Sequence, residues 1–237
     1  MIRALADLVL PRRCAGCGAP GELLCAACRP SGPPIVVPGL GGPVFAAGRY
    51  ERGLRGAVLA YKERGRHELA EPFAALLAST AARLPIAGGV LVPVPSARRA
   101  VRRRGGDHVL RLACRTGARL GVATVPALRL GRPVHDSAGL GVDERRTNLA
   151  GAMVAAPPPR EGTAAVLVDD IVTTGATVQE ALRALHGAGW AVSGGLTLAI
   201  TPLRRRALAP TVAGDHGKPN PERDERLREE PAAAPGG

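Results

Sequence analysis

An apolar run that ends in two adjacent carboxylates constrains this chain more than any other feature. The stretch reads VLVDDIVTTGATV and spans Val166 to Val178. Its first three residues have the unbroken apolar character of a strand buried on both faces of a parallel sheet. Asp169 and Asp170 follow at the carboxyl end of the predicted strand, where α/β folds bind ligands. Two neighbouring acids there cost free energy unless hydrogen-bond donors or positive charge meet them.

The turn after the acids is suited to a phosphate group. It consists of small side chains, hydroxyls and one glycine: Thr173, Thr174, Gly175, Ala176 and Thr177. Backbone N–H groups at the start of the following helix can converge on an anion. The two hydroxyls of a ribose would be suitable donors for the acids. The alternative is a strand end with an ordinary turn, but acids, loop and helix occur here in the order that a sugar phosphate requires.

Strand-like and helical segments alternate through the rest of the chain. Strands are expected at 44–50, 89–95, 124–130, 163–169 and 196–201, and helices at 54–61, 67–84, 109–120 and 178–186. This alternation predicts an α/β fold with a mainly parallel sheet flanked by helices. Before it come a cysteine-containing N-terminal segment (1–30) and a Pro/Gly-rich linker (31–43), and the domain itself covers 44–203. The tail (204–237) is rich in Pro and charge, which predicts disorder.

Four of the five cysteines form two closely spaced C-x-x-C pairs. The pairs are Cys14 with Cys17 and Cys25 with Cys28, and together they can complete a tetrahedral Zn²⁺ site. Two disulfides are disfavoured without an export signal, and a redox C-x-x-C usually lies beside a βαβ unit. We therefore predict a structural zinc that supplies folding energy to the N-terminal segment. Cys114 is expected to be an ordinary buried thiol.

The formal net charge is +12, which is typical of nucleic-acid-binding proteins. Only Lys62 and Lys218 are lysines, however, and an arginine-rich bias also arises from a GC-rich genome. The first ten residues are too short and too interrupted for a membrane span and lack a signal-peptide cleavage site. A short amphipathic helix, no membrane insertion and a cytoplasmic location are expected.

The stretch from Val166 to Val178 resembles the 5-phosphoribosyl-1-pyrophosphate (PRPP) motif of type I phosphoribosyltransferases. The resemblance implies that Asp169 and Asp170 lie over the ribose hydroxyls and that the loop 173–177 wraps the 5′-phosphate. It also implies Mg²⁺ with the pyrophosphate, whose departure passes through an oxocarbenium-like state that preorganised charge stabilises. In that family the loop after the strand predicted at 89–95 faces pyrophosphate. Ser96, Arg98 and Arg99 are the corresponding candidates here.

The order of the motifs resembles the ComF family of competence-associated proteins over about residues 10 to 203. The four cysteines are followed by VPVPSARRAVRRRGG, then DERRTNLAGAM, then the PRPP-type motif. The resemblance implies a link to DNA uptake, with single-stranded DNA or a DNA-uptake helicase as possible partners. The family usually continues after RGG with an aromatic residue, Asn and Gln, whereas this chain has Gly106, Asp107 and His108. Ser137 replaces a Gln common in the family.

Several polar residues have a functional and an ordinary interpretation. Lys62 is either at the mobile edge of the site or an exposed lysine, and the arginines after Ser96 either bind an anion or are solvated. A stripe of Arg111, Arg115 and Arg119 could meet DNA or form a plain exposed face. A third group either reaches the site or forms a salt-bridged helix turn with Asp143 and Glu144: Arg145, Arg146 and Asn148. His135 or Asp136 either supplies an acid or base or has no catalytic role.

Three functions follow from these features. The chain could transfer ribose 5-phosphate from PRPP to an acceptor, sense PRPP without chemistry, or bind DNA or a helicase as an accessory protein. An acceptor-recognition segment would separate the three, and the sequence contains none that can be identified.

Overall fold

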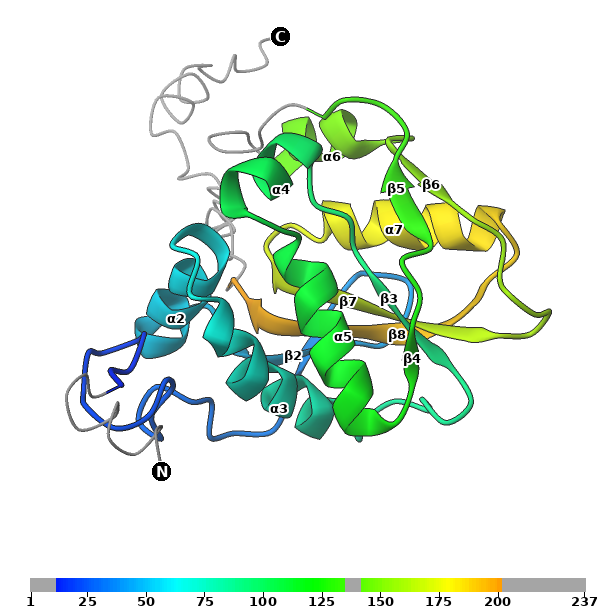
Figure 1. Ribbon diagram of the computed structural model, residues 1–237. Helices are drawn as coiled ribbons and strands as arrows, with labels where there is room; N and C mark the ends of the chain where they lie inside the picture. Colours follow the sequence, from blue (N-terminus) through cyan, green and yellow to red (C-terminus); the bar gives the residue numbers. More distant parts are fainter. Residues whose placement is uncertain (1–11, 135–141, 202–237) are drawn as a thin grey trace, which may run out of the picture. The chain divides into compact units, whose positions relative to one another are not determined.

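The computed structural model describes residues 12–134 and 142–201, which belong to one compact unit of the chain (Figure 1). Some predictions lie outside the described residues. They concern the N-terminal helix (1–10), the tail (204–237), His135, Asp136 and Ser137, and the side chains of Arg145 and Arg146.

A six-stranded sheet forms the centre of this unit, in the order β1-β2-β8-β7-β3-β4. Its strands are β1 (Ile35–Val37), β2 (Val44–Arg49), β3 (Val90–Pro93), β4 (Ala123–Thr124), β7 (Ala164–Val172) and β8 (Ala191–Ile200). Only β1 is antiparallel to its neighbour, and the other strands are parallel. The predicted α/β fold with a mainly parallel sheet is therefore confirmed.

Helices cover both faces of the sheet. They are α2 (Arg52–Glu63), the 3₁₀ turn η1 (His67–Leu69), α3 (Ala70–Ala81), α4 (Arg98–Arg104), α5 (His108–Leu120), α6 (Val142–Leu149) and α7 (Ala176–Gly187). Val166 and Val168 pack in a cluster with residues of α3 and α5, whereas Leu167 packs in another with residues of α7. Strand β7 is thus buried on both faces, as its apolar run predicts. No helix among the described residues has both the length and the apolar character needed to cross a bilayer.

Several elements differ from the sequence-based expectation because of pairing that is distant in sequence. Strand β7 continues through both acids to Val172, since it pairs with β8 as far as the pair Val172–Ile200. The predicted linker contains β1, which adds to the sheet edge beside β2. Pro126 interrupts the strand expected at 124–130, because proline cannot donate to a ladder. Its second half, β5 (Leu128–Leu130), pairs instead with β6 (Met153–Ala155) in a separate two-stranded sheet.

The α5 helix explains one wrong prediction. Its buried positions include Val109, Leu112, Ala113 and Thr116, so Cys114 lies on the opposite face and is exposed, not buried. Two members of the arginine stripe contact neighbouring elements. Arg119 pairs with Glu71 of α3, and Arg111 approaches Nδ1 of His67 at 2.9 Å.

The sheet has a topological switch point between β3 and β7. From β3 the chain passes through α5 to β4 on one side, and from β7 it passes through α7 to β8 on the other. Because α5 and α7 lie on opposite faces, the loops after β3 and β7 diverge and leave a crevice at the carboxyl ends of the strands. The fold therefore places both predicted ligand-binding segments at one edge of the sheet.

Candidate functional site

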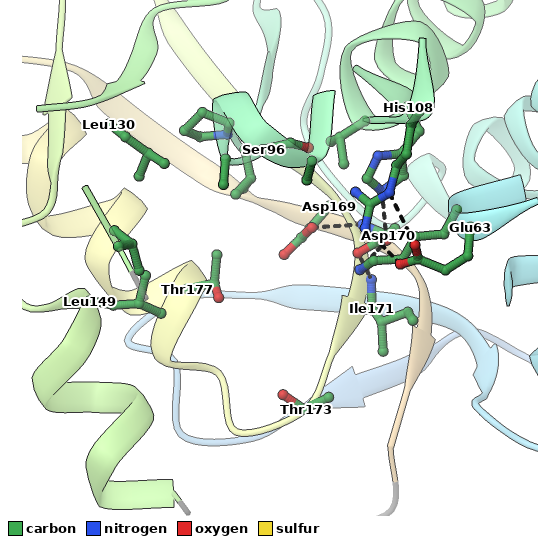
Figure 2. Close-up of a pocket in the computed structure, with 18 of the residues that line it drawn as sticks. Glu63, Ser96, His108, Leu130, Leu149, Asp169, Asp170, Ile171, Thr173 and Thr177 are labelled. Carbon is green, nitrogen blue, oxygen red and sulfur yellow. Dashed lines mark hydrogen bonds and ion pairs between the residues drawn. The ribbon is translucent and has the colours of Figure 1, made fainter. Parts of the chain in front are cut away.

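A cavity of about 1070 Å³ lies at this switch point (Figure 2). Most of the residues predicted to contact ligand line it: Ser96, Arg99, Asp169, Asp170, Thr173, Thr174, Ala176 and Thr177. Arg98 and Gly175 do not line the cavity. The structure thus brings the acids, the threonine loop and the segment after β3 to one cavity.

Gly175 gives the threonine loop its shape. The residue has a φ of 79° at the N-cap of α7, in the left-handed region that favours glycine. A Cβ at this position would also lie 2.4 Å from Leu40 Cδ2. Thr174 Oγ1 accepts a hydrogen bond from the Ala176 N–H at 3.4 Å. Gly175 therefore packs against Leu40 and does not line the cavity, whereas its neighbours Thr174 and Ala176 do.

The two acids are buried, with 8% of Asp169 and 4% of Asp170 exposed. Asp169 Oδ1 accepts from the Asp170 N–H at 2.8 Å. Burial, together with the charge of Asp170, raises the pKa of Asp169 well above its usual value. Burial alone would also raise the pKa of Asp170, but Lys62 and His108 outweigh it and hold that pKa low. The two neighbouring acids therefore have opposite electrostatic character.

Asp170 has two partners from other elements. Lys62 Nζ of α2 lies 2.7 Å from Asp170 Oδ2, and His108 Nε2 of α5 lies 2.8 Å from the same oxygen. Lys62 lines the cavity, which supports its functional interpretation, and it is not simply an exposed lysine. In the sequence, His108 is distinguished only as a departure from a family pattern. Nothing in the spacing of these residues indicates that they would converge.

Asp107 connects the loop after β3 to α5. Its carboxylate accepts from the Val109 and Leu110 N–H groups at the start of the helix, at 2.9 and 3.2 Å. It also accepts from the N–H and the Oγ of Ser96 at 3.3 and 3.1 Å. Asp107 is therefore a helix cap that also fixes Ser96 beside the cavity.

The arginines of α4 are divided into two groups. Arg104 Nη2 lies 2.6 Å from Glu63 Oε1, and Arg103 reaches Glu63 Oε2 at 3.4 Å. Arg98, Arg99 and Arg102 are exposed. Glu63 of α2 thus partly neutralises the predicted anion-binding patch, whereas Arg98, Arg99 and Arg102 have no ion pair within the described residues.

An apolar wall faces the acids across the cavity. Four residues from the β5–β6 and α6 region form part of it: Leu130, Val134, Leu149 and Met153. Figure 2 shows Leu130 and Leu149 on the side of the cavity opposite His108. The sequence carries no local signal for this wall, because the β5–β6 pairing joins segments more than twenty residues apart.

The four N-terminal cysteines converge. Their sulfur atoms all lie within 4.8 Å of one another, and the Sγ atoms of Cys17 and Cys25 are 3.6 Å apart. Thiolates bound to one zinc ion at about 2.3 Å would be about 3.8 Å apart, so the cluster fits a tetrahedral ion. Cys14 Sγ accepts from the N–H groups of Gly16 and Cys25, both at 3.4 Å. Burial opposes ionisation of Cys14, but backbone N–H groups nevertheless lower its pKa to about 6.

The cysteine cluster packs directly against the start of α2. A Cβ on Gly53 would lie 2.2 Å from Cys28 Sγ, and one on Gly16 would lie 2.5 Å from the Gly53 carbonyl oxygen. Cys14 and Cys28 are buried in the same apolar cluster as Leu54 and Ala57 of α2. The cluster is thus part of the main core and is not an independent appendage.

Comparisons with known proteins give limited similarity. No family model matches the chain, and no curated protein matches it. Among solved structures, the chain is similar to the crystal structure of orotate phosphoribosyltransferase from Aeropyrum pernix, with 17% identity and a TM-score of 0.35. The match covers 63% of this chain and 66% of that chain, so this chain spans less than two thirds of that protein.

Proposed function

We propose that this chain is a ComF-type protein with a phosphoribosyltransferase-like fold that binds PRPP. The observation that carries the proposal is that Asp169, Asp170 and every residue of the loop 173–177 except Gly175 line one cavity at the switch point of a parallel sheet. The acids would accept from the ribose hydroxyls, and the loop with the first turn of α7 would bind the 5′-phosphate. Ser96 and Arg99, after β3, would face the pyrophosphate.

Two metals belong to this proposal. Mg²⁺ would enter with the pyrophosphate, where the acids and the ligand's own oxygens could hold it and it would neutralise charge on the leaving group. Zn²⁺ would be held by Cys14, Cys17, Cys25 and Cys28 and would be structural, since four protein ligands leave no open position. Transfer of ribose 5-phosphate to an acceptor, linked to DNA uptake, is the activity that this site would support. A PRPP sensor would use the same pocket without transfer.

Calorimetric titration with PRPP and Mg²⁺ tests the pocket. We expect binding by the wild type and none by the Asp169→Asn/Asp170→Asn double variant, because each carboxylate would lose its negative charge and one of its two acceptor oxygens, and an amide NH2 would take that oxygen's place. Thr177→Val, a nearly isosteric change beside the cavity, is expected to weaken binding on the order of 10-fold through loss of one hydrogen bond to a charged phosphate. No binding by the wild type, or equal binding by all three proteins, would contradict the proposal. Pyrophosphate release on addition of candidate bases would then separate a transferase from a sensor.

The exposed arginines of α4 favour a second candidate function, the binding of single-stranded DNA. Arg98 and Arg102 are exposed and do not line the cavity. If they contact phosphates, the Arg98→Gln/Arg102→Gln variant should bind DNA more weakly and show a salt slope smaller by about 2. Arg83→Gln is the control, because Arg83 is exposed and lies before β3, at the amino ends of the strands and away from the cavity at their carboxyl ends. An unchanged slope in the double variant would assign these arginines to solvent.

A further inference from the structure

We propose that Lys62 is a ligand-binding residue of the cavity, that Asp170 acts by holding Lys62 in place, and that Asp169 is the acid left open for the ligand. This inference rests on the proposed function, because it divides the roles within the same site. It replaces a symmetric pair of acids by one contact acid and one positioning acid.

Both oxygens of Asp170 have partners in the protein, and Oδ2 has two. Oδ1 accepts from the Ile171 N–H at 2.7 Å. Oδ2 receives Lys62 Nζ at 2.7 Å and His108 Nε2 at 2.8 Å. A carboxylate oxygen has about two lone-pair positions, so Oδ2 has no position left for a ligand hydroxyl.

Asp169 is arranged differently. Its Oδ1 accepts from the Asp170 N–H, and within the described residues no donor binds its Oδ2. Figure 2 shows the Asp169 side chain extending toward the open centre of the cavity, whereas Asp170 lies on the side of His108 and Glu63. Among the described residues, Asp169 Oδ2 is therefore the oxygen of the pair that has no donor from the protein.

His108, which also lines the cavity, fixes the orientation of Asp170. An ionised carboxylate only accepts hydrogen bonds, so His108 Nε2 must be the donor, and its tautomer follows. The ring is 3% exposed and packs edge-on against Tyr61, which also donates to the His108 carbonyl oxygen at 2.7 Å. Since Tyr61 and Lys62 are neighbours on α2, these contacts join α2 to α5 next to the lysine.

Lys62 retains capacity for an anion. Its ammonium has three N–H donors, of which Asp170 takes one, and its side chain is still 29% exposed in a residue that lines the cavity. Arginine supplies nearly all of the other basic side chains of this chain, yet a lysine stands here. A compact ammonium can share one carboxylate oxygen with a histidine, whereas a planar guanidinium favours both oxygens of its partner. The remaining two donors can reach phosphate or pyrophosphate oxygens.

A double-mutant cycle tests these roles, with PRPP and Mg²⁺ titrated into the wild type, Lys62→Met, Asp170→Asn and the double variant. We expect Lys62→Met to weaken binding by about 10- to 100-fold, the range for a hydrogen bond between charged groups. Asp170→Asn should weaken it to a similar degree, and the double variant no further than either single change. Arg83→Gln, which removes one positive charge at the amino ends of the strands, should leave the affinity for PRPP unchanged.

The outcomes are distinct. If the fold-losses in affinity of the two single variants multiply in the double variant, Asp170 itself contacts the ligand and the inference is overturned. The inference is also overturned if Lys62→Met binds with the same affinity as the wild type. Absence of binding in the wild type overturns the proposed function and the inference together. If the single variants do not fold, the double variant, which removes both members of the Lys62–Asp170 ion pair, still tests the lysine: it must bind about 10- to 100-fold more weakly than wild type, and wild-type affinity would overturn the inference.

Discussion

Replacing Cys28 by serine is expected to reduce the bound zinc from about one ion per chain to none and to lower the free energy of unfolding by more than about 4 kcal/mol. Two effects combine in this loss. A serine hydroxyl is a poor zinc ligand, so the segment loses the ion that orders it. Cys28 is also buried against Gly53 of α2 and belongs to the main apolar cluster, so the disturbance reaches the core.

The measurement is metal analysis of the purified protein together with thermal unfolding. Cys114→Ser is the matched control, because Cys114 is exposed on α5 and remote in sequence from the cluster. It should keep the zinc and change stability by no more than about 0.5 kcal/mol. A wild-type protein that contains no zinc, or a Cys28→Ser protein that retains it, would refute the structural metal.

Exchanging each acid for asparagine is expected to change stability in opposite directions. Asp170→Asn should cost about 3 kcal/mol at neutral pH, because it leaves the buried Lys62 ammonium without its counter-charge. Asp169→Asn should stabilise the protein at the same pH. It removes a buried charge beside Asp170 and keeps an oxygen to accept from the Asp170 N–H.

The pH dependence gives the same contrast. Since the folded-state pKa of Asp169 is raised, its contribution to stability is complete below about pH 4, the ordinary value, and is lost as the pH rises through the folded-state pKa. The folded-state pKa of Asp170 is lowered, so its contribution is present above about pH 4 and is lost as the pH falls through that pKa. Urea denaturation of both variants at pH 5 and pH 8 checks this. If the two changes shift stability in the same direction at pH 8, the assigned asymmetry is wrong.

The sequence predicts the parts of this molecule that depend on local pattern. The apolar run before Asp169 predicts a doubly buried strand, and the small residues after it predict a loop and helix start, both of which the structure contains. The two C-x-x-C pairs predict a cluster of four sulfur atoms, which also forms. In each case the decisive residues are neighbours in the chain, so their spacing carries the information.

The sequence does not predict what depends on contacts between distant elements. Lys62, His108 and Asp170 come from three different elements, and only the packing of α2 and α5 at the carboxyl edge of β7 brings them together. The exposure of Cys114 depends on which face of α5 is turned to the core, and a helical period alone does not settle every position. The apolar wall depends on the pairing of β5 with β6, for which the chain carries no local signal.

Helix α2 contacts both the cysteine cluster and the cavity. Its start packs against Cys28 through Gly53, and its last turn carries Lys62 and Glu63 to the acids and to α4. Its 12 residues span about 18 Å, so one rigid element is shared by the two sites. Any free energy by which a metal bound to the four cysteines favours this placement of α2 would appear equally in the affinity for a ligand bound in the cavity, and the reverse also holds. Oxidation of the thiols would then change the affinity of the cavity for its ligand, although no cysteine lines the cavity.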